Sequence, residues 1–539
     1  MASIKQIKAE RHHFHLLLQC ALPLLLLLPL KAKGQEQPQT GRQRVEIHHT
    51  DLLMYDKLNG RERKKLIGNV FLQHKDMLMN CDSAWYYEDT NQVFAFSNIH
   101  IHQGDTIHIY GKYLSYDGNT GQAVMTDSVE MVDKETRLFT DKINYDTRTQ
   151  VADYNTGGKL LNGDNTLTSM IGIYYSAQKM VHFRDSVKIV NPKYVMKADT
   201  LRYNTLTEVV YFEGPSEAKG DSIYLYCEKG WSNTKSNVSR LMKNAVLDNM
   251  KQRLSGDTLF YDENKGFGEG YGNVFITDEA GDVAASGNYG WYYKEPERFM
   301  MTRDAAFTFI SKDDTLTLRA DTLRAVPQAD TAGINHRLLK AYNNCSIYST
   351  ELQGVCDSLS FSFRDSVVRL YTEPIIWSEE NQMTADSMAL FTVNRAPQRM
   401  ELYNTPFIVS TVDSSRFNQV KGKSLVGYFK DNKLSHVVID GNGELIFYVI
   451  DGTKLIGVNK AKCATIEIFF KEGKVQYISQ NMGPDGTMDP PSLNTTEEPR
   501  LDNFKWFPDK RPLRTDYQKY MESLKSLKSI KSIKPIKSE

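Results

Sequence analysis

The chain has 539 residues, with 66 basic and 66 acidic side chains and therefore no formal net charge. This balance excludes the strong electrostatic attraction on which nucleic-acid binding depends. Tyrosine (29) and phenylalanine (24) are abundant and proline (17) is modest, a mixture that favours β-strands over disorder.

Residues 1–34 have the pattern of a secretory signal peptide. Basic residues precede an apolar run, Leu16–Leu30, and the small residues Ala32 and Gly34 stand just before Gln35. The run is short for a membrane-spanning helix, and no later apolar stretch is long enough to form one. We expect cleavage before Gln35 and export from the cytoplasm, with a retained N-terminal anchor as the alternative. Residues 35–45 are polar and predict a flexible leader.

A five-residue signature, Asp-(Ser/Thr)-Leu-x-Tyr, recurs through most of the chain. It is clearest at Asp199–Tyr203 and Asp257–Tyr261. Related segments start at positions 82, 112, 141, 171, 199, 228, 257 and 288, in steps of 28 to 31 residues. A fixed period of this length indicates stacked structural units, each too small to bury its own apolar face.

A second element keeps the same period. Gly68-Asn69-Val70-Phe71-Leu72 returns as Gly272-Asn273-Val274-Phe275-Ile276. Between these copies, apolar and polar residues alternate with period two, as in Asn98–His102, which is typical of strands with one buried face. We predict regular β-repeats over residues 46–300 and looser ones over 301–480.

The C-terminal part departs from the repeat. Residues 481–515 are rich in Pro and Gly, and we expect them to form a cap over the last strands. Within residues 516–539, the segment Ser523–Lys534 repeats Leu-Lys-Ser and Ile-Lys-Ser triplets, which drift off any single face of a helix. We expect a disordered basic tail there, with a segment that binds anionic lipid headgroups as the alternative.

The signature, followed in register by Gly-Asn-Val-x-Ile, resembles the OstA-like family, which includes LptA and the periplasmic domain of LptD. The resemblance covers residues 46–300 well and 300–480 loosely. Ile456–Cys463, with Phe504-Lys505-Trp506, is similar to the C-terminal part of the long OstA-like proteins of Bacteroidetes. The resemblance implies an all-β fold, an elongated repeat-built β-jellyroll of two twisted antiparallel sheets with an apolar groove between them.

The same resemblance implies a function. We expect a periplasmic, non-enzymatic carrier without cofactor or metal, which shields the acyl chains of lipopolysaccharide or a related glycolipid and helps carry it to the outer membrane. The implied partners are other jellyroll components of a lipopolysaccharide-transport bridge, joined by edge-to-edge strand pairing, or further copies of this chain.

The candidate groove residues occupy equivalent inward positions of the repeat, and the alternative is that they are only the packed core between two sheets. They are Val70, Leu72, Ile99, Ile101, Leu114, Tyr116, Val129, Met131, Ile143, Tyr145, Ile173, Tyr175, Val187, Ile189, Leu201, Tyr203, Leu259, Tyr261, Val274 and Ile276.

Other residue clusters favour plain structural roles. His100, His102 and His108 would need to converge with a carboxylate to bind a metal, and a solvated strand face is the simpler interpretation. The recurring aspartates suit strand entries rather than catalytic pairs. Cys345 and Cys356 either pair in an oxidising compartment or remain buried thiols.

Two other functions compete with a lipid carrier. One is a structural or adhesive repeat protein of the cell envelope, which would differ from a carrier by not binding lipid. The other is a secreted β-helix that degrades polysaccharides, which predicts shorter coils, asparagine ladders and a catalytic cluster, none of which the sequence contains.

Overall fold

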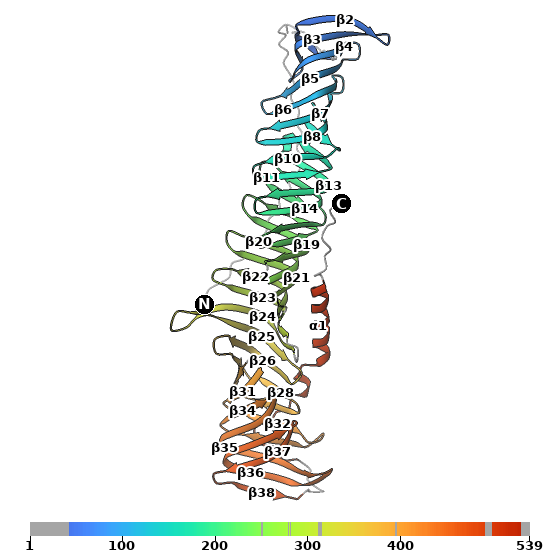
Figure 1. The fold of residues 1–539 in the computed structure, drawn as a ribbon. Coiled ribbons are helices and arrows are strands. Elements are labelled where there is room, and N and C mark those ends of the chain that lie inside the picture. Colours follow the sequence, from blue (N-terminus) through green and yellow to red (C-terminus); the bar gives the residue numbers. More distant parts are fainter. Residues whose placement is uncertain are drawn as a thin grey trace, which may run out of the picture. The chain divides into compact units, whose positions relative to one another are not determined.

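A computed structural model describes residues 43–529 except 222, 250–251, 279, 281, 311–314, 394–395 and 491–497. The predicted signal peptide and most of the predicted leader lie outside the described residues, as does the end of the predicted tail. From Arg44 onward the described residues belong to one unit. Its strands join through antiparallel hydrogen bonding into one continuous sheet, in which consecutive strands stack as successive rungs (Figure 1).

The first strands are β1 (Glu46–His49), β2 (Leu52–Leu58), β3 (Arg61–His74), β4 (Met77–Tyr87), β5 (Gln92–Gln103), β6 (Ile107–Asp117), β7 (Gln122–Asp133), β8 (Thr136–Asp146), β9 (Val151–Tyr154), β10 (Gly158–Asn162), β11 (Asn165–Ser169), β12 (Ile171–Tyr175) and β13 (Met180–Asn191). They continue with β14 (Tyr194–Asn204), β15 (Val209–Phe212), β16 (Ser216–Gly220), β17 (Tyr224–Cys227), β18 (Lys229–Asn233), β19 (Val238–Asp248), β20 (Gln252–Asp262), β21 (Phe267–Asp278), β22 (Val283–Tyr293), β23 (Arg298–Ile310), β24 (Thr315–Ala329) and β25 (Asn335–Tyr348).

The remaining strands are β26 (Leu352–Ser362), β27 (Val367–Tyr371), β28 (Ile375–Ser378), β29 (Asn381–Thr384), β30 (Ser387–Val393), β31 (Ala396–Tyr403), β32 (Phe407–Thr411), β33 (Phe417–Lys421), β34 (Ser424–Lys430), β35 (Lys433–Asp451), β36 (Lys454–Lys471), β37 (Lys474–Asn481) and β38 (Asp485–Asp489). The helical elements are two 3-10 turns, η1 (Ser176–Gln178) and η2 (Pro508–Lys510), and one α-helix, α1 (Arg514–Ser529).

The two sheets expected from the sequence are the two halves of the same long strands. In β5 the pairing register shifts between Phe96 and Ile99, and the residues between them, Ser97 and Asn98, have φ of 60° and 49°. Such left-handed bulges bend a strand sharply. Val93 and Ile101, on opposite sides of the bend, are both fully buried. Each bent strand therefore contributes to both walls of one interior, which confirms the all-β jellyroll.

The second sequence element forms this corner, and the signature aspartate fastens it. Asn273 donates a side-chain hydrogen bond to the Asp257 carboxylate at 3.1 Å, and Asn69 donates one to Asp51 at 2.9 Å. Gly272 has φ +67°, and a Cβ at this position would overlap the Asp257 carboxylate. The recurring aspartates therefore lie at the bend in the middle of their strands, as Asp257 does in β20, and not at strand entries.

Replacing Gly272 by alanine is expected to lower the free energy of unfolding by about 1–3 kcal/mol, because alanine is strained at positive φ and its Cβ displaces Asp257. The measurement is the midpoint of urea denaturation. Gly333 has φ +78° but open space around its Cα, so Gly333→Ala carries the strain without the overlap. Equal losses for both variants would show that the contact with Asp257 contributes nothing.

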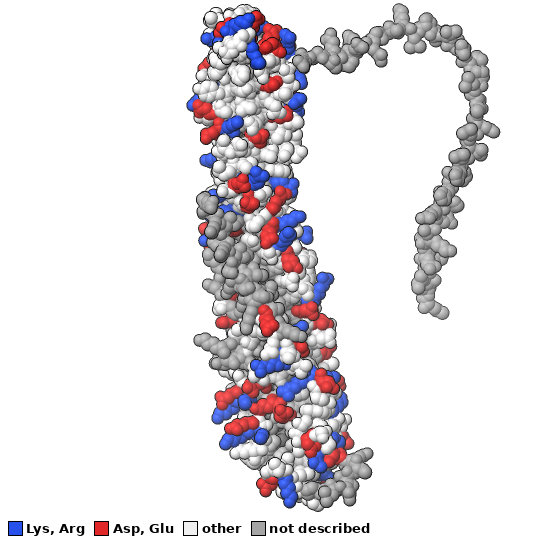
Figure 2. Space-filling view, turned by 90° about the vertical axis from the view of Figure 1, so that its right-hand side faces the viewer, with Lys and Arg blue, Asp and Glu red and all other residues white. Residues whose placement is uncertain are grey.

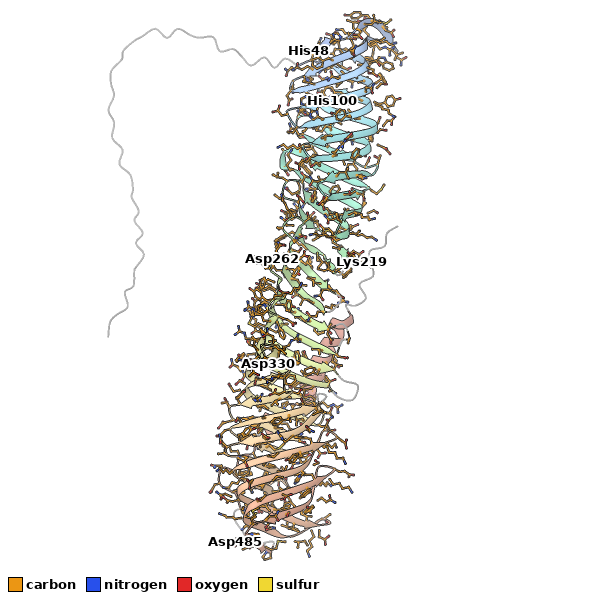
Figure 3. All side chains as sticks on the ribbon, turned by 60° about the vertical axis from the view of Figure 1, so that its left-hand side comes forward. His48, His100, Lys219, Asp262, Asp330 and Asp485 are labelled. Carbon is orange, nitrogen blue, oxygen red and sulfur yellow. The ribbon has the colours of Figure 1, made fainter. Side chains whose placement is uncertain are left out.

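The interior divides into two apolar clusters along the stack. One runs from Val45 to Leu259 and the other from Val274 to Ile468, with Leu254 packed against both. Figure 3 labels His48 near one end of the stack and Asp485 at the other. On the face shown in Figure 2, acidic and basic side chains are interspersed without a large patch of one sign among the described atoms.

The C-terminal segment covers more than the last strands. At its start, Leu501 packs against the cluster that contains Tyr448 of β35 and Val458 of β36. Residues 498–511, here called the strap, run back along the outer face of β33, β29 and β26. Three buried glutamines, one in each of these strands, hold it. Gln419 accepts a hydrogen bond from Leu501 N, Gln382 accepts one from Phe507 N, both at 2.8 Å, and Gln353 accepts from the Arg511 guanidinium at 2.6 Å.

The strap continues into α1, which lies beside the strands of the middle rungs (Figure 1). Tyr520 shares a 2.9 Å hydrogen bond with Ser286 of β22, and Tyr517 shares one of 2.8 Å with Ser346 of β25. The expectation of a disordered tail is therefore wrong for residues 516–529, because two tyrosines anchor the first turns of this segment to the sheet. No helix in the described residues is long and apolar enough to cross a membrane.

Replacing Gln382 by alanine is expected to loosen the strap at a cost of about 1–3 kcal/mol. Gln382 is fully buried and bonds both Phe507 N and Lys505 O, so its loss removes the partners of two backbone groups. Hydrogen exchange at the Phe507 amide measures the effect. Gln398→Ala, at an exposed position, is the control and should leave hydrogen exchange at the Phe507 amide unchanged. Unchanged exchange in Gln382→Ala would contradict the role of Gln382 in holding the strap.

Candidate functional site

In the first part of the stack, a row of tyrosines closes the interior at the mouth, the side away from the corner. A tyrosine of one half-sheet reaches a polar residue at the far end of the other half, and in three of four cases it is the fifth residue of the signature. These polar clasps are Tyr116 to His74 (2.6 Å), Tyr145 to Gln103 (2.6 Å), Tyr174 to Asp133 (2.6 Å) and Tyr203 to Asn162 (2.7 Å). All four tyrosines are at most 2% exposed.

The clasp at Asp133 also contains an ion pair. Lys179 Nζ lies 2.7 Å from the Asp133 carboxylate, which is 1% exposed and also accepts hydrogen bonds from Tyr174 and Ser176. Burial raises the pKa of Asp133, but the hydrogen bonds from Lys179, Tyr174 and Ser176 outweigh it and hold the pKa below its ordinary value. The carboxylate therefore stays ionised, and the interior remains closed at this rung.

Further along the stack the clasp tyrosines give way to apolar residues. The signature copy at 357–361 ends in Phe361, and the copy at 386–390 ends in Leu390. Phe361 meets Phe309 of the opposite half-sheet, with ring centroids 6.2 Å apart and rings nearly perpendicular. Both phenylalanines are half-buried. Aromatic rings rather than hydrogen-bonded polar groups thus face each other across the mouth of these rungs.

Behind these phenylalanines lies an apolar cavity of about 70 Å³, here called the slot. Its walls come from both halves of β23–β28 and from β30. The lining residues are Phe307, Phe309, Leu316, Leu318, Leu339, Ile347, Leu352, Leu359, Phe361, Val368, Leu370, Ile376, Leu390 and Thr392. Cavities lined in this way stay dry and accept apolar ligands.

The mouth stays apolar beyond the slot. Half-buried apolar side chains lie along the edge of the second cluster. They run from Ile276 and Val283 near its start to Val475 and Ile478 near its end. In the first cluster, the comparable residues from Tyr194 to Tyr261 lie toward the junction with the second. The closed core and the apolar mouth therefore occupy different parts of one stack.

None of the residues predicted from the sequence lines the slot. Most of them are buried in the packed core: Val70, Leu72, Ile99, Ile101, Leu114, Tyr116, Val129, Met131, Ile143, Tyr145, Val187, Ile189, Leu201, Tyr203, Leu259 and Val274. Tyr261 and Ile276 are half-buried at the edges of the two clusters. Their burial agrees with the alternative of a packed core, and their lipid contact stays a prediction.

The predicted inward orientation of Ile173 and Tyr175 is wrong. Gly172 and Tyr174 are the buried residues of β12, and Ile173 and Tyr175 lie on the outer face. This copy of the signature lacks the aspartate, so the inward positions were inferred from the spacing of the neighbouring copies. A shift of one residue in a strand moves every side chain to the opposite face.

The histidine cluster lies on the outer face of β5 and β6. The His102 and His108 rings stack with centroids 4.5 Å apart, and His100 Nε2 lies 3.0 Å from His108 Nδ1. Burial, together with the neighbouring histidines, lowers the pKa of His100. In the described part of the chain no group of three or more His, Cys, Asp or Glu residues is arranged to hold a metal ion.

The residues of the slot could have been found from one sequence signal. At the fifth position of the signature, tyrosine is replaced by Phe361 and Leu390 in successive looser copies. Both copies lie within residues 301–480, where only looser repeats were predicted. On the opposing wall, Phe309 stands outside any copy of the signature, and Leu316 belongs to a looser copy, Asp314-Thr315-Leu316-Thr317-Leu318.

Fold and slot together define an all-β jellyroll with a closed half and an apolar-mouthed half. Residues 42–199 match the family model described as OstA-like protein, which confirms the resemblance for that segment. The match ends before the slot begins.

The comparison with solved structures finds LptH, the LptA homologous periplasmic component of the conserved lipopolysaccharide transport device from Pseudomonas aeruginosa. The two chains are 16% identical, and the similarity covers 19% of this chain and 79% of LptH with a TM-score of 0.18. A comparison with curated proteins finds no match.

Proposed function

We propose that this chain is a periplasmic carrier that binds the acyl chains of lipopolysaccharide or a related glycolipid in the slot and helps move it to the outer membrane. The observation that supports this proposal most directly is the apolar slot behind Phe309 and Phe361. The OstA-like match of residues 42–199 supports the same class of function. The predicted signal peptide, which directs the chain out of the cytoplasm, lies outside the described residues.

The energy for binding comes from removing acyl chains from water. Burial of apolar surface contributes about 25 cal/mol per Å². Apart from Thr392, the slot is lined by aliphatic and aromatic side chains, while the sugars and phosphates of a glycolipid remain outside the mouth. Binding in this arrangement requires no reaction, so the proposal includes no catalytic residue and no cofactor.

The slot must widen to admit an acyl chain. Its volume of about 70 Å³ is smaller than that of a fatty acyl chain. Separating an aromatic pair such as Phe309 and Phe361 costs only about 0.5–1.5 kcal/mol beyond the area exposed. We therefore expect the lipid to enter sideways between these rings, while the clasped rungs stay shut and serve as a rigid spacer.

The ends of the stack suit pairing with other jellyrolls. At one end β2 pairs with β3, and its seven residues are all exposed, including Leu52 and Met54. At the other end β38 and β37 pair with different parts of β36. In the described residues these strands form edges of the sheet, and open edges favour strand addition. The proposed partners are jellyroll components of a lipid-transport bridge or another copy of this chain.

Site-specific photocrosslinking in cells tests the proposal. A photoreactive residue at Phe361 should yield adducts with lipopolysaccharide. Ser360, the adjacent residue on the outer face, is the matched control and should yield none. The buried clasp residue Tyr203 should also yield none, which distinguishes the slot from the groove predicted by the repeat. If Phe361 gives no adduct in a folded, exported protein, the carrier proposal fails and a structural or adhesive envelope protein becomes the better interpretation.

The β-helix alternative conflicts with the strand topology. A right-handed β-helix is built from parallel strands, whereas the strand pairs of the described chain, such as β13 with β14 and β35 with β36, are antiparallel.

A further inference from the structure

Two cysteines face each other across neighbouring strands. Cys345 of β25 and Cys356 of β26 are direct partners in the antiparallel register, and both are free thiols in this structure. Directly opposed residues in antiparallel strands have Cα atoms about 4.5 or 5.5 Å apart. Both spacings fall within the range of about 4.4–6.8 Å that a disulfide spans. The backbone therefore already has the separation that a disulfide requires.

The two thiols are also in contact. A hydrogen bond with Cys345, followed by burial, raises the pKa of the Cys356 thiol. Cys345 is 1% exposed and Cys356 is 8% exposed. The sulfur atoms thus lie close together and are shielded from solvent in the folded chain.

The other described cysteines have no such partner. Cys81 is opposite Val70, Cys227 is opposite Ser216, and Cys463 is opposite Gly443. Alanines occupy the equivalent corner position two strands earlier, where Ala305 faces Ala320. The corner thus accepts small residues generally, and the thiol pair is confined to one rung among the described residues.

This rung forms the base of the slot. Cys345 follows the corner residues Asn343 and Asn344, which have φ of 60° and 52°. The next inward residues, Ile347 in β25 and Leu359 in β26, line the slot. A bond between the two sulfurs would therefore join β25 to β26 where the two walls of the slot meet.

We propose that Cys345 and Cys356 form a disulfide that fastens the base of the slot when the chain folds in the presence of a disulfide oxidant, either a small-molecule disulfide or a thiol–disulfide oxidoreductase. The thiolate of one cysteine attacks the oxidant's S–S bond, forms a mixed disulfide and releases one reduced thiol. The second cysteine thiolate then displaces the other half. Each cysteine loses its proton, and the oxidant leaves as two thiols.

Folding and oxidation are coupled by the burial of the pair. Thiol–disulfide exchange needs a thiolate that the oxidant can reach. In the folded chain both cysteines are buried and the pKa of the Cys356 thiol is raised, so neither condition is met. The bond therefore forms while β25 and β26 pair, before the rung closes. Once formed, it is buried and resists reduction. It would keep the two strands joined at the corner when the mouth of the slot opens.

Peptide mapping of the full chain refolded with oxidised glutathione tests the proposal. Trypsin releases both cysteines in one peptide, residues 341–364, because no lysine or arginine lies between Lys340 and Arg364. The peptide should be two hydrogen atoms lighter than after reduction. Cleavage at Glu351, which lies between the cysteines, should leave two fragments that separate only on reduction. Two free thiols, or two separate glutathione adducts, would overturn the proposal.

A measurement of stability tests the disulfide proposal independently. The Cys345→Ala, Cys356→Ala double variant should fold, since alanines face each other at the equivalent corner of β23 and β24. Reductant should lower the denaturation midpoint of the oxidised wild-type chain and leave that of the double variant unchanged. If reductant shifts neither, the sulfurs form no bond that fastens the slot. This outcome concerns the thiols alone, so it is distinguishable from a failure to bind lipid.

Discussion

Replacing Phe361 by aspartate is expected to weaken the binding of purified lipopolysaccharide at least about tenfold, which corresponds to about 1.4 kcal/mol. The new carboxylate stands at the mouth of the slot, opposite Phe309, where an acyl chain would have to pass. Placing an unpaired charge against an apolar chain costs at least this much. Equilibrium binding to the purified full chain measures the loss.

The matched control is Ser360→Asp, one residue away on the outer face, where Ser360 contacts the exposed Tyr371. It places the same charge on the same strand without entering the slot. Both variants should keep the wild-type thermal transition, which separates loss of binding from loss of fold. Equal affinity in Phe361→Asp and the wild type would remove the slot as the lipid site, and an equal loss in the control would assign the effect to surface charge.

Replacing Asp133 by asparagine is expected to lower the free energy of unfolding by about 2–4 kcal/mol. The carboxylate is buried and bonds Lys179, Tyr174 and Ser176, so the variant leaves the Lys179 ammonium without its counter-charge. Lys179 is 25% exposed, which places the expected loss toward the lower end for a buried ion pair. Asp105→Asn, in the exposed turn between β5 and β6, should change stability little. A similar small change in Asp133→Asn would contradict a closing role for this clasp.

The same clasp predicts a dependence on pH. The pKa of Asp133 is depressed in the folded chain, so its stabilising contribution is complete above the unfolded-state pKa of about 3.9. It is lost as the pH falls through the folded-state value. The denaturation midpoint of the wild-type chain should therefore fall more steeply than that of Asp133→Asn below about pH 4. Parallel curves for the two proteins would show that the pKa of Asp133 is not depressed in the folded chain.

The closed half of the molecule was largely predictable, because its contacts repeat. Alternation placed Ile99 and Ile101 inside and His100 and His102 outside, and the structure has the same arrangement. The Gly-Asn pairs, predicted only as a repeated element, form corners at positive φ, a conformation that glycine and asparagine tolerate well. The copy without a signature aspartate lost its phase, and Ile173 was assigned to the wrong face.

The slot was not predictable from the repeat. Phe361 and Leu390 depart visibly from the signature, but a missing tyrosine leaves space only if the opposing wall does not fill it. That wall comes from other strands and carries Phe309, which no motif marks. The strap was equally hidden, since the pairing of Gln353 with Arg511 joins residues 158 positions apart.

The sequence by itself determined the repeat, the alternation of buried and exposed residues, and the corner residues at which each strand bends. These properties depend on backbone geometry and on neighbours within one or two strands, which a periodic pattern records. Only the tertiary structure decided where the interior is closed by tyrosines and where it opens at Phe309 and Phe361. Such differences arise from the packing of side chains on opposing walls, and the volume left between two walls is a property of neither wall alone.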